Sequence, residues 1–135
     1  MPGLKSTYLA NLYLNALYAG ALFDTAIPAT IYCQPYTAAP TAGGGGTQWT
    51  VSGISRVAKT RNTTNFPTST AASIASATTY AFGTPSATGV VVGFGFFDAS
   101  SGGNLLSYFQ LDAAITATSG VAFTLPVGAL IGTEA

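Results

Sequence analysis

Residues 90–111 of this chain read VVVGFGFF-DASSGGN-LLSYFQL and give its clearest structural signal. Its first part, 90–97, consists only of apolar residues and glycine, a pattern typical of a central strand buried on both faces. The segment 98–104 is rich in serine and glycine and predicts the turn of a hairpin. The segment 105–111 then returns as the partner strand.

Shorter strand-like segments flank this hairpin on both sides, at 28–37, 49–59, 79–83, 113–118, 121–125 and 127–133. The last three suggest a second hairpin around Ser119-Gly120 and a final strand. Many short strands separated by turns are typical of sandwiches and barrels. We therefore predict a mainly β fold, a β-sandwich of about seven to nine short antiparallel strands.

The beginning of the chain has a different periodicity. Leu4, Tyr8 and Leu12 recur at four-residue spacing, which predicts an amphipathic α-helix of about 14–18 residues within 4–23. Ser6 or Thr7 can cap its start, and Gly20 can end it. Two asparagines interrupt the apolar run, which argues against a membrane-spanning helix. A secretory signal is the alternative to the amphipathic helix and is less favoured for the same reason.

The predicted organisation is an N-terminal helix and connector at 1–27, followed by a β-sandwich domain at 28–135. One segment of that domain, 60–78, is a polar run of Thr, Ser, Asn and Ala around Phe66, and we call it the Thr/Ser-rich arm. A structureless loop of this length is unusual in a compact domain. Either the arm extends and becomes ordered on a partner, or it contains a short strand near Phe66.

Charge is scarce in this chain of 135 residues. Only 6% of its residues are charged, against roughly 25% in ordinary soluble domains, and the formal net charge is zero. We therefore expect no specific binding of nucleic acid and no attraction to a membrane. A surface covered by other subunits can dispense with charge, so assembly is favoured. A surface kept soluble by hydroxyl and amide groups is the alternative.

The residues that most enzymes need are missing. The chain has no histidine, which excludes Ser-His-Asp and Cys-His pairs and histidine-bound metals. The glycines at 43–46 lack the Lys and Ser/Thr of a phosphate loop. Asp98 opens a glycine-rich turn, so turn capping is favoured over catalysis with Asp112 or calcium binding. Cys33 lies in an apolar run and is expected to be a buried, inert thiol. We expect no enzyme, cofactor or metal.

Five short motifs are spread along nearly the whole chain after the helix. They are YTAAP at 36–40, SGISRVA at 52–58, VVGFGFFDA at 91–99, GGNLL at 102–106 and GAL at 128–130. In this order they resemble a family of short structural proteins of tailed phages, which are labelled head decoration (cement) or tail-fibre-like proteins. The segment 93–106 is the most specific part. The long Thr/Ser-rich arm and the low charge depart from the family pattern. The resemblance implies a β-sandwich subunit on a phage particle, without catalytic residues.

The first hypothesis is therefore a capsid cement protein in the virion. It would sit on the outer surface of the capsid as a homo-oligomer, a dimer or trimer, and stabilise the shell by binding the major capsid protein. The alternative is a tail, baseplate or tail-fibre component that contacts a receptor. In that case Trp49, Tyr80 and Tyr108 are candidates for a sugar-binding face. A soluble enzyme or lectin is the least favoured reading.

Three features supply candidate contacts with a partner: the apolar stripe of the helix, the arm, and a cluster that holds three of the four cations. The candidate residues are Tyr8, Leu12, Arg56, Lys59, Arg61 and Phe66. The cationic cluster suits an acidic partner or a few phosphates. A solvated strand end is the plainer explanation of the same charges.

Overall fold

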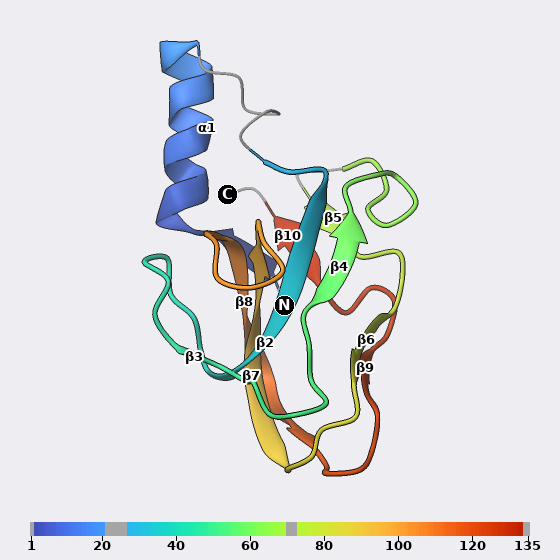
Figure 1. The fold of residues 1–135 in the computed structure, drawn as a ribbon. Helices are drawn as coiled ribbons and strands as arrows, with labels where there is room; N and C mark the ends of the chain where they lie inside the picture. The colour runs from blue at the N-terminus through green and yellow to red at the C-terminus, as the bar shows by residue number, and fades with distance from the viewer. Residues whose placement is uncertain (1, 21–26, 70–72, 134–135) are drawn as a thin grey trace.

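The computed structural model describes residues 2–20, 27–69 and 73–133, which contain one helix and ten strands (Figure 1). Their bounds are α1 Thr7–Ala19, β1 Pro2–Lys5, β2 Thr30–Ala38, β3 Thr47–Gln48, β4 Val57–Thr60, β5 Ser73–Ala75, β6 Tyr80–Gly83, β7 Gly89–Phe97, β8 Leu105–Ala117, β9 Phe123–Leu125 and β10 Ile131–Thr133. The prediction of a mainly β chain with an N-terminal helix is confirmed.

Eight strands form the main sheet, in the order β3-β2-β7-β8-β1-β10-β5, with β4 also paired to β2. The predicted central hairpin lies in its middle, because β7 pairs with β8 on one side and with β2 on the other. Asp98 fixes the turn of that hairpin. One of its carboxylate oxygens accepts from the backbone N–H of Asn104 (2.7 Å) and the other from the Asn104 side-chain amide (3.0 Å). The predicted turn-capping role of Asp98 is thus confirmed.

A second, two-stranded sheet of β6 and β9 covers one face of the main sheet, and aromatic rings fill the space between them. Phe82 of β6 stacks on Phe123 of β9 (ring centroids 5.3 Å apart) and on Phe94 of β7 (5.6 Å). Tyr80 contacts Phe96 edge to face at 6.1 Å. Cys33 is fully buried in the same core, and this burial raises the pKa of its thiol, as expected of an inert cysteine.

Strand pairing differs from the sequence prediction at two places. The segments 105–111 and 113–118 form one long strand, β8, with an irregular stretch between Gln110 and Ile115. The predicted hairpin around Ser119-Gly120 is therefore wrong, since β9 pairs with β6 and not with the strand before it. In addition, β1 and β10 pair in parallel, which differs from the predicted antiparallel arrangement. Parallel pairing is possible here since no hairpin joins the two strands.

The helix α1 stands out from the end of the sheet (Figure 1). Ser6 caps it by accepting a hydrogen bond from the N–H of Leu9 (3.1 Å), and Gly20 ends it in the left-handed conformation, as predicted. Leu4 lies before the helix, in β1. None of the residues of α1 is buried, although the helix contacts β8 and β1 at its base.

The described part of the Thr/Ser-rich arm lies on the body of the chain. It contains a turn, in which the N–H of Phe66 donates to the carbonyl of Asn62 (2.9 Å), and the strand β5, which pairs with β10. The arm therefore does contain a short strand, but at 73–75 and not near Phe66. Residues 70–72 of the arm lie outside the described part.

Candidate partner-contact surface

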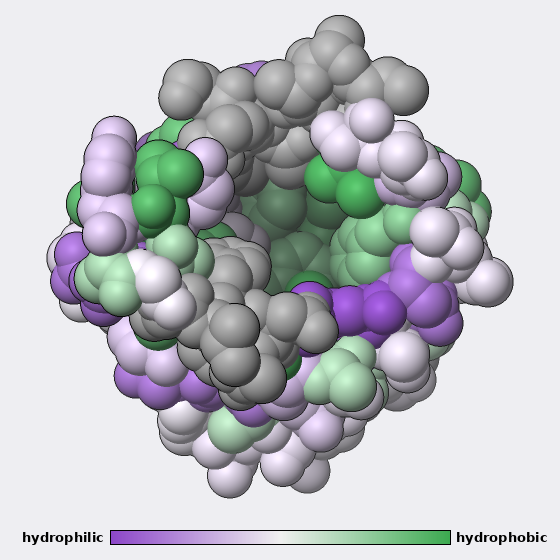
Figure 2. All heavy atoms as spheres, turned by 90° about the horizontal axis from the view of Figure 1, so that it is seen from above, coloured by the Kyte–Doolittle hydropathy of each residue, from purple (hydrophilic) through white to green (hydrophobic). Residues whose placement is uncertain are grey.

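An apolar hollow opens at the end of the molecule on which α1 stands. Figure 2, seen from that end, shows the hollow with its hydrophobic floor. It comprises three adjoining cavities of about 140, 380 and 200 Å³, which share Ile31 of β2 in their walls. The other apolar side chains that line them are Leu9, Ile27, Phe66, Ile74, Phe96, Leu106, Phe109 and Leu130.

The hollow suits uncharged, apolar groups. Of the described residues that line it, Arg61 is the one with a charged side chain, and it holds the start of β2 in place. Its guanidinium donates to the carbonyls of Pro28 (2.6 Å) and Ile27 (2.8 Å). Apolar surface that is removed from water contributes roughly 25 cal/mol per Å², so covering the hollow would be favourable.

Phe66, a predicted partner-contact residue, lies in the wall of this hollow. Its ring meets Phe96 edge to face at 6.1 Å. The turn that carries it is held by Asn65, whose side chain donates to the carbonyl of Thr60 (2.9 Å) and accepts from the hydroxyl of Thr78 (3.1 Å). The structure thus brings two of the six candidates, Arg61 and Phe66, to one surface.

The other two cations of the predicted cluster bind groups of their own chain elsewhere. Lys59 donates to the hydroxyl of Thr78 (2.8 Å) and the carbonyl of Thr79 (2.7 Å), and its ammonium lies 4.5 Å from the centre of the Tyr80 ring. Desolvation lowers the pKa of Lys59. Arg61 binds the start of β2, so the three cations do not form a common basic patch.

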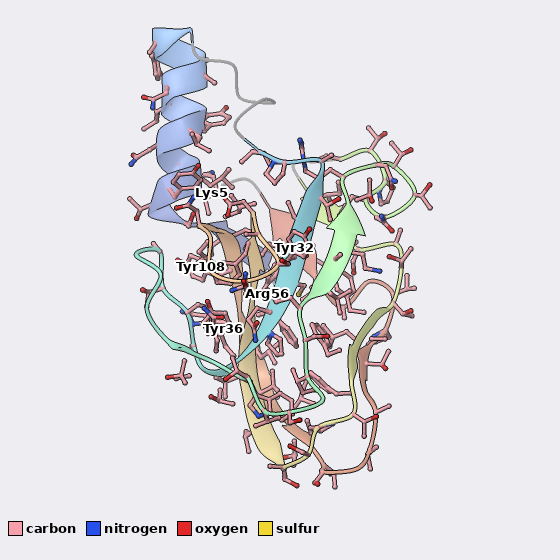
Figure 3. The ribbon with its side chains drawn as sticks, in the orientation of Figure 1. Lys5, Tyr32, Tyr36, Arg56 and Tyr108 are labelled. Carbon is pink, nitrogen blue, oxygen red and sulfur yellow. The ribbon has the colours of Figure 1, made fainter. Side chains whose placement is uncertain are left out.

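Arg56, labelled in Figure 3, joins three segments: β2, β3 and the turn between β7 and β8. Its guanidinium lies 3.9 Å above the centre of the Phe97 ring and donates to carboxamide oxygens of Gln34 (3.2 Å) and Gln48 (3.1 Å). It also donates to the carbonyls of Ala99 (2.7 Å) and Gly102 (2.9 Å) in the central turn. Desolvation lowers the pKa of Arg56, against the influence of Tyr36 and Asp98. These contacts give Arg56 a structural role.

The helix presents a larger apolar surface than the sequence predicted. Tyr8 and Leu12, the two helix residues among the candidates, are partly buried. The most exposed large apolar side chains of α1 are instead Tyr13, Leu14, Leu17 and Tyr18, at 47%, 50%, 59% and 80% exposure. The sequence indicated the apolar stripe of the helix as a partner contact but singled out only Tyr8 and Leu12 on it. Apolar residues at almost every turn position are a signal of a helix with more than one contact face.

The aromatic residues predicted for a sugar-binding face are not available for that role. Trp49, Tyr80 and Tyr108 are all buried in the two apolar clusters of the chain. Within the described ranges, no three His, Cys, Asp or Glu side chains are grouped closely enough to hold a metal ion. None of the helices described there has the length and apolarity to cross a membrane.

Comparison with known protein families gives a match that spans nearly the whole chain. The family described as "Podophage GP4 fiber I protein gp80" matches residues 5–133, from the end of β1 to the end of β10. The match therefore includes α1, both sheets and the apolar hollow. No curated protein sequence matches the chain.

Proposed function

The chain belongs to the podophage GP4 fiber I protein gp80 family, and on this premise we propose that it is a structural subunit of a podophage fibre. Membership of the family makes it a phage structural protein, a component of the virion. The observation that carries the proposal is the match to this fibre-protein family over residues 5–133. The exposed apolar helix and hollow, which suit contacts with other subunits, support it further.

The family description favours the tail-side alternative over the capsid cement protein that the sequence first suggested. The cement hypothesis was based on the scarcity of charge, the Thr/Ser-rich arm and the resemblance, and of these only the resemblance favoured the capsid over the tail. A fibre subunit has the same need for large neutral contact faces, so the scarcity of charge agrees with it equally well.

The proposed occupant of the apolar surface is a second copy of this chain. No charged residue lies within α1, and Leu9 of the helix lines the hollow, in which Arg61 is the one described lining residue with a charge, so the helix and the hollow adjoin. The exposed parts of four helix side chains amount to roughly 400 Å², whereas a stable interface needs about 800 Å² per partner. We therefore propose that the interface of a dimer or trimer covers the helix face and extends into the hollow.

Replacing Leu14, Leu17 and Tyr18 together with glutamine is expected to separate the oligomer into monomers. Each large apolar side chain contributes about 1.5–3 kcal/mol when buried, so losing three weakens association by roughly a thousandfold or more. Sedimentation equilibrium measures the change in mass. The double variant Asn11→Gln, Asn15→Gln is the matched control and keeps the wild-type mass. A wild-type chain that sediments as a monomer would contradict the proposal, as would a triple variant of unchanged mass.

Imaging of intact phage particles tests the fibre assignment itself. A gold-labelled antibody against this chain is expected to mark fibres at the tail end of the particle, because a fibre subunit is confined to those appendages. Particles assembled without the chain control for non-specific label. Label spread evenly over the head would overturn the fibre proposal and return the cement hypothesis to first place.

A further inference from the structure

A second cavity, of about 350 Å³, lies apart from the apolar hollow. It is enclosed by the first turn of α1, the glycine loop 42–44 and the turn between β7 and β8. We propose that this cleft binds one neutral carbohydrate unit. The proposal goes beyond the structural role above and does not depend on it, because the isolated chain can be tested for binding.

The floor and rim of the cleft have different chemistry. Buried Phe97 and Leu105 contribute an apolar floor, while the exposed side chains of Thr7 and Asn104 lie at the rim. A sugar ring has apolar C–H faces and a periphery of hydroxyls that both donate and accept. The volume is at the small end of the range for ligand sites, about 300–1,000 Å³, so it suits a single ring better than a long chain.

Polar atoms for such a ligand are present at the rim. Within the part of the chain that the structure describes, no hydrogen bond engages the hydroxyls of Thr7 and Tyr8 or the side-chain oxygen of Asn104. Gln48 is held in the wall by Arg56, which donates to its oxygen (3.1 Å). The aromatic ring of Tyr8, which lines the cleft, can pack on a sugar face.

The same cleft is poorly suited to an anion. None of the described residues that line it is charged. Two N–H groups at the helix N-terminus beside it already have partners, because the N–H of Leu9 donates to the Ser6 hydroxyl and the N–H of Thr7 donates to the carbonyl of Ala42 (2.8 Å). Two charges at the central turn are also engaged: Arg56 by carbonyls, and Asp98 by Asn104. A neutral ligand therefore fits better than a phosphate or an acidic sugar.

Gly43 offers a way to close the cleft without disturbing the fold. A Cβ added at Gly43 would meet no atom within 4 Å, and its φ is not in the left-handed region. The change Gly43→Leu is expected to fill the cleft and abolish binding. The matched control, Ala113→Leu, places the same side chain at an exposed position of β8 and is expected to bind as the wild type does. Thr7→Val removes one hydroxyl and should weaken binding about fivefold.

The experiment follows backbone amide shifts of the nitrogen-labelled full chain by NMR. The probes are methyl glycosides of glucose, galactose and rhamnose and free N-acetylglucosamine, with inorganic phosphate and sialic acid as anions. At least one neutral sugar should shift the amides of Gly43, Gly44 and Gly103, and the Gly43→Leu chain should show no such shift. If Gly43→Leu does not fold, the test is the Thr7→Val chain, which should bind the same sugar about fivefold more weakly than the wild type.

Three results would overturn the proposal. The first is that no neutral sugar shifts these amides. The second is that the folded Gly43→Leu chain, or Thr7→Val where Gly43→Leu is unfolded, binds as tightly as the wild type. The third is that phosphate or sialic acid binds more tightly than every neutral sugar. None of these results bears on the fibre assignment, which the imaging experiment tests separately.

Discussion

Replacing Gly53 with alanine is expected to destabilise the folded chain by roughly 3 kcal/mol or more, whereas Gly120→Ala should cost only about 1 kcal/mol. Both glycines have a left-handed backbone, with φ values of 90° and 79°. They differ in their surroundings. A Cβ on Gly53 would overlap the carbonyl oxygen of Thr84, while a Cβ on Gly120 would meet nothing within 4 Å. The difference in stability between the two variants therefore measures the cost of the overlap between the added Cβ and the backbone.

The close contact at Gly53 joins the two sheets. A Cβ on Gly83 would in turn overlap the carbonyl of Gly53, so the two glycines let two backbones approach each other. Ile54 forms a bridge with Gly83, and the N–H of Ser55 donates to the carbonyl of Phe82 (3.1 Å). Widening this contact would move β6 away from the main sheet and expose the rings around Phe82 to water.

The reactivity of Cys33 can be used to measure the loss of stability in these variants. Its thiol is fully buried, and burial raises its pKa, so it reacts with a thiol reagent only when the core opens. A loss of 3 kcal/mol corresponds to labelling of Gly53→Ala roughly a hundredfold faster than the wild type. Urea denaturation followed by tryptophan fluorescence gives an independent value. Equal labelling rates for Gly53→Ala and Gly120→Ala would show that the backbone contact is not important for stability.

The features that the sequence predicted correctly are those encoded by neighbouring residues. The central hairpin is signalled by an apolar strand, a Ser/Gly turn with Asp98 and a second apolar strand, all within 90–111. The helix is likewise signalled by its own periodicity and by Ser6 and Gly20 at its ends. In both cases the hydrogen bonds that fix the element join residues close in sequence.

The features that the sequence did not predict depend on distant segments. β9 follows β8 closely, yet it pairs with β6, whose Phe82 stacks on Phe123 across the two strands. β1 and β10 meet in parallel although nearly the whole chain separates them. No local turn signal can report such pairings, because they are selected by the packing of the complete core.

The same distinction applies to the candidate contact surface. Phe66 and Arg61 were found because a lone aromatic residue and a cation stand out in a polar segment, and both do lie at the hollow. Ile31 and Ile74 could not be found, since an isoleucine in a strand is ordinarily a core residue. The contacts of the cationic cluster could not be found for a related reason. Proximity in sequence does not reveal that Arg56 and Lys59 bind carbonyls of different segments.

Replacing Arg56 with alanine is expected to destabilise the chain by about 3 kcal/mol. The change leaves the oxygen of Gln34, a buried side chain, without its Arg56 partner, and an unsatisfied buried acceptor costs about 1–3 kcal/mol. It also removes the guanidinium from the face of Phe97 and releases the central turn at Ala99 and Gly102. Urea denaturation should show a lower midpoint with an unchanged slope.

Arg56→Lys separates geometry from charge. Lysine keeps the positive charge, but a single ammonium cannot reach acceptors that are spread over β2, β3 and the central turn, so we expect it to recover less than half of the lost stability. The hydrogen-bond partners of Arg56 are neutral oxygens, so the destabilisation should persist in high salt, unlike that of a surface ion pair. Full recovery by lysine, or disappearance of the effect in high salt, would mean that Arg56 acts through its charge and that the bridge between the three segments is unimportant.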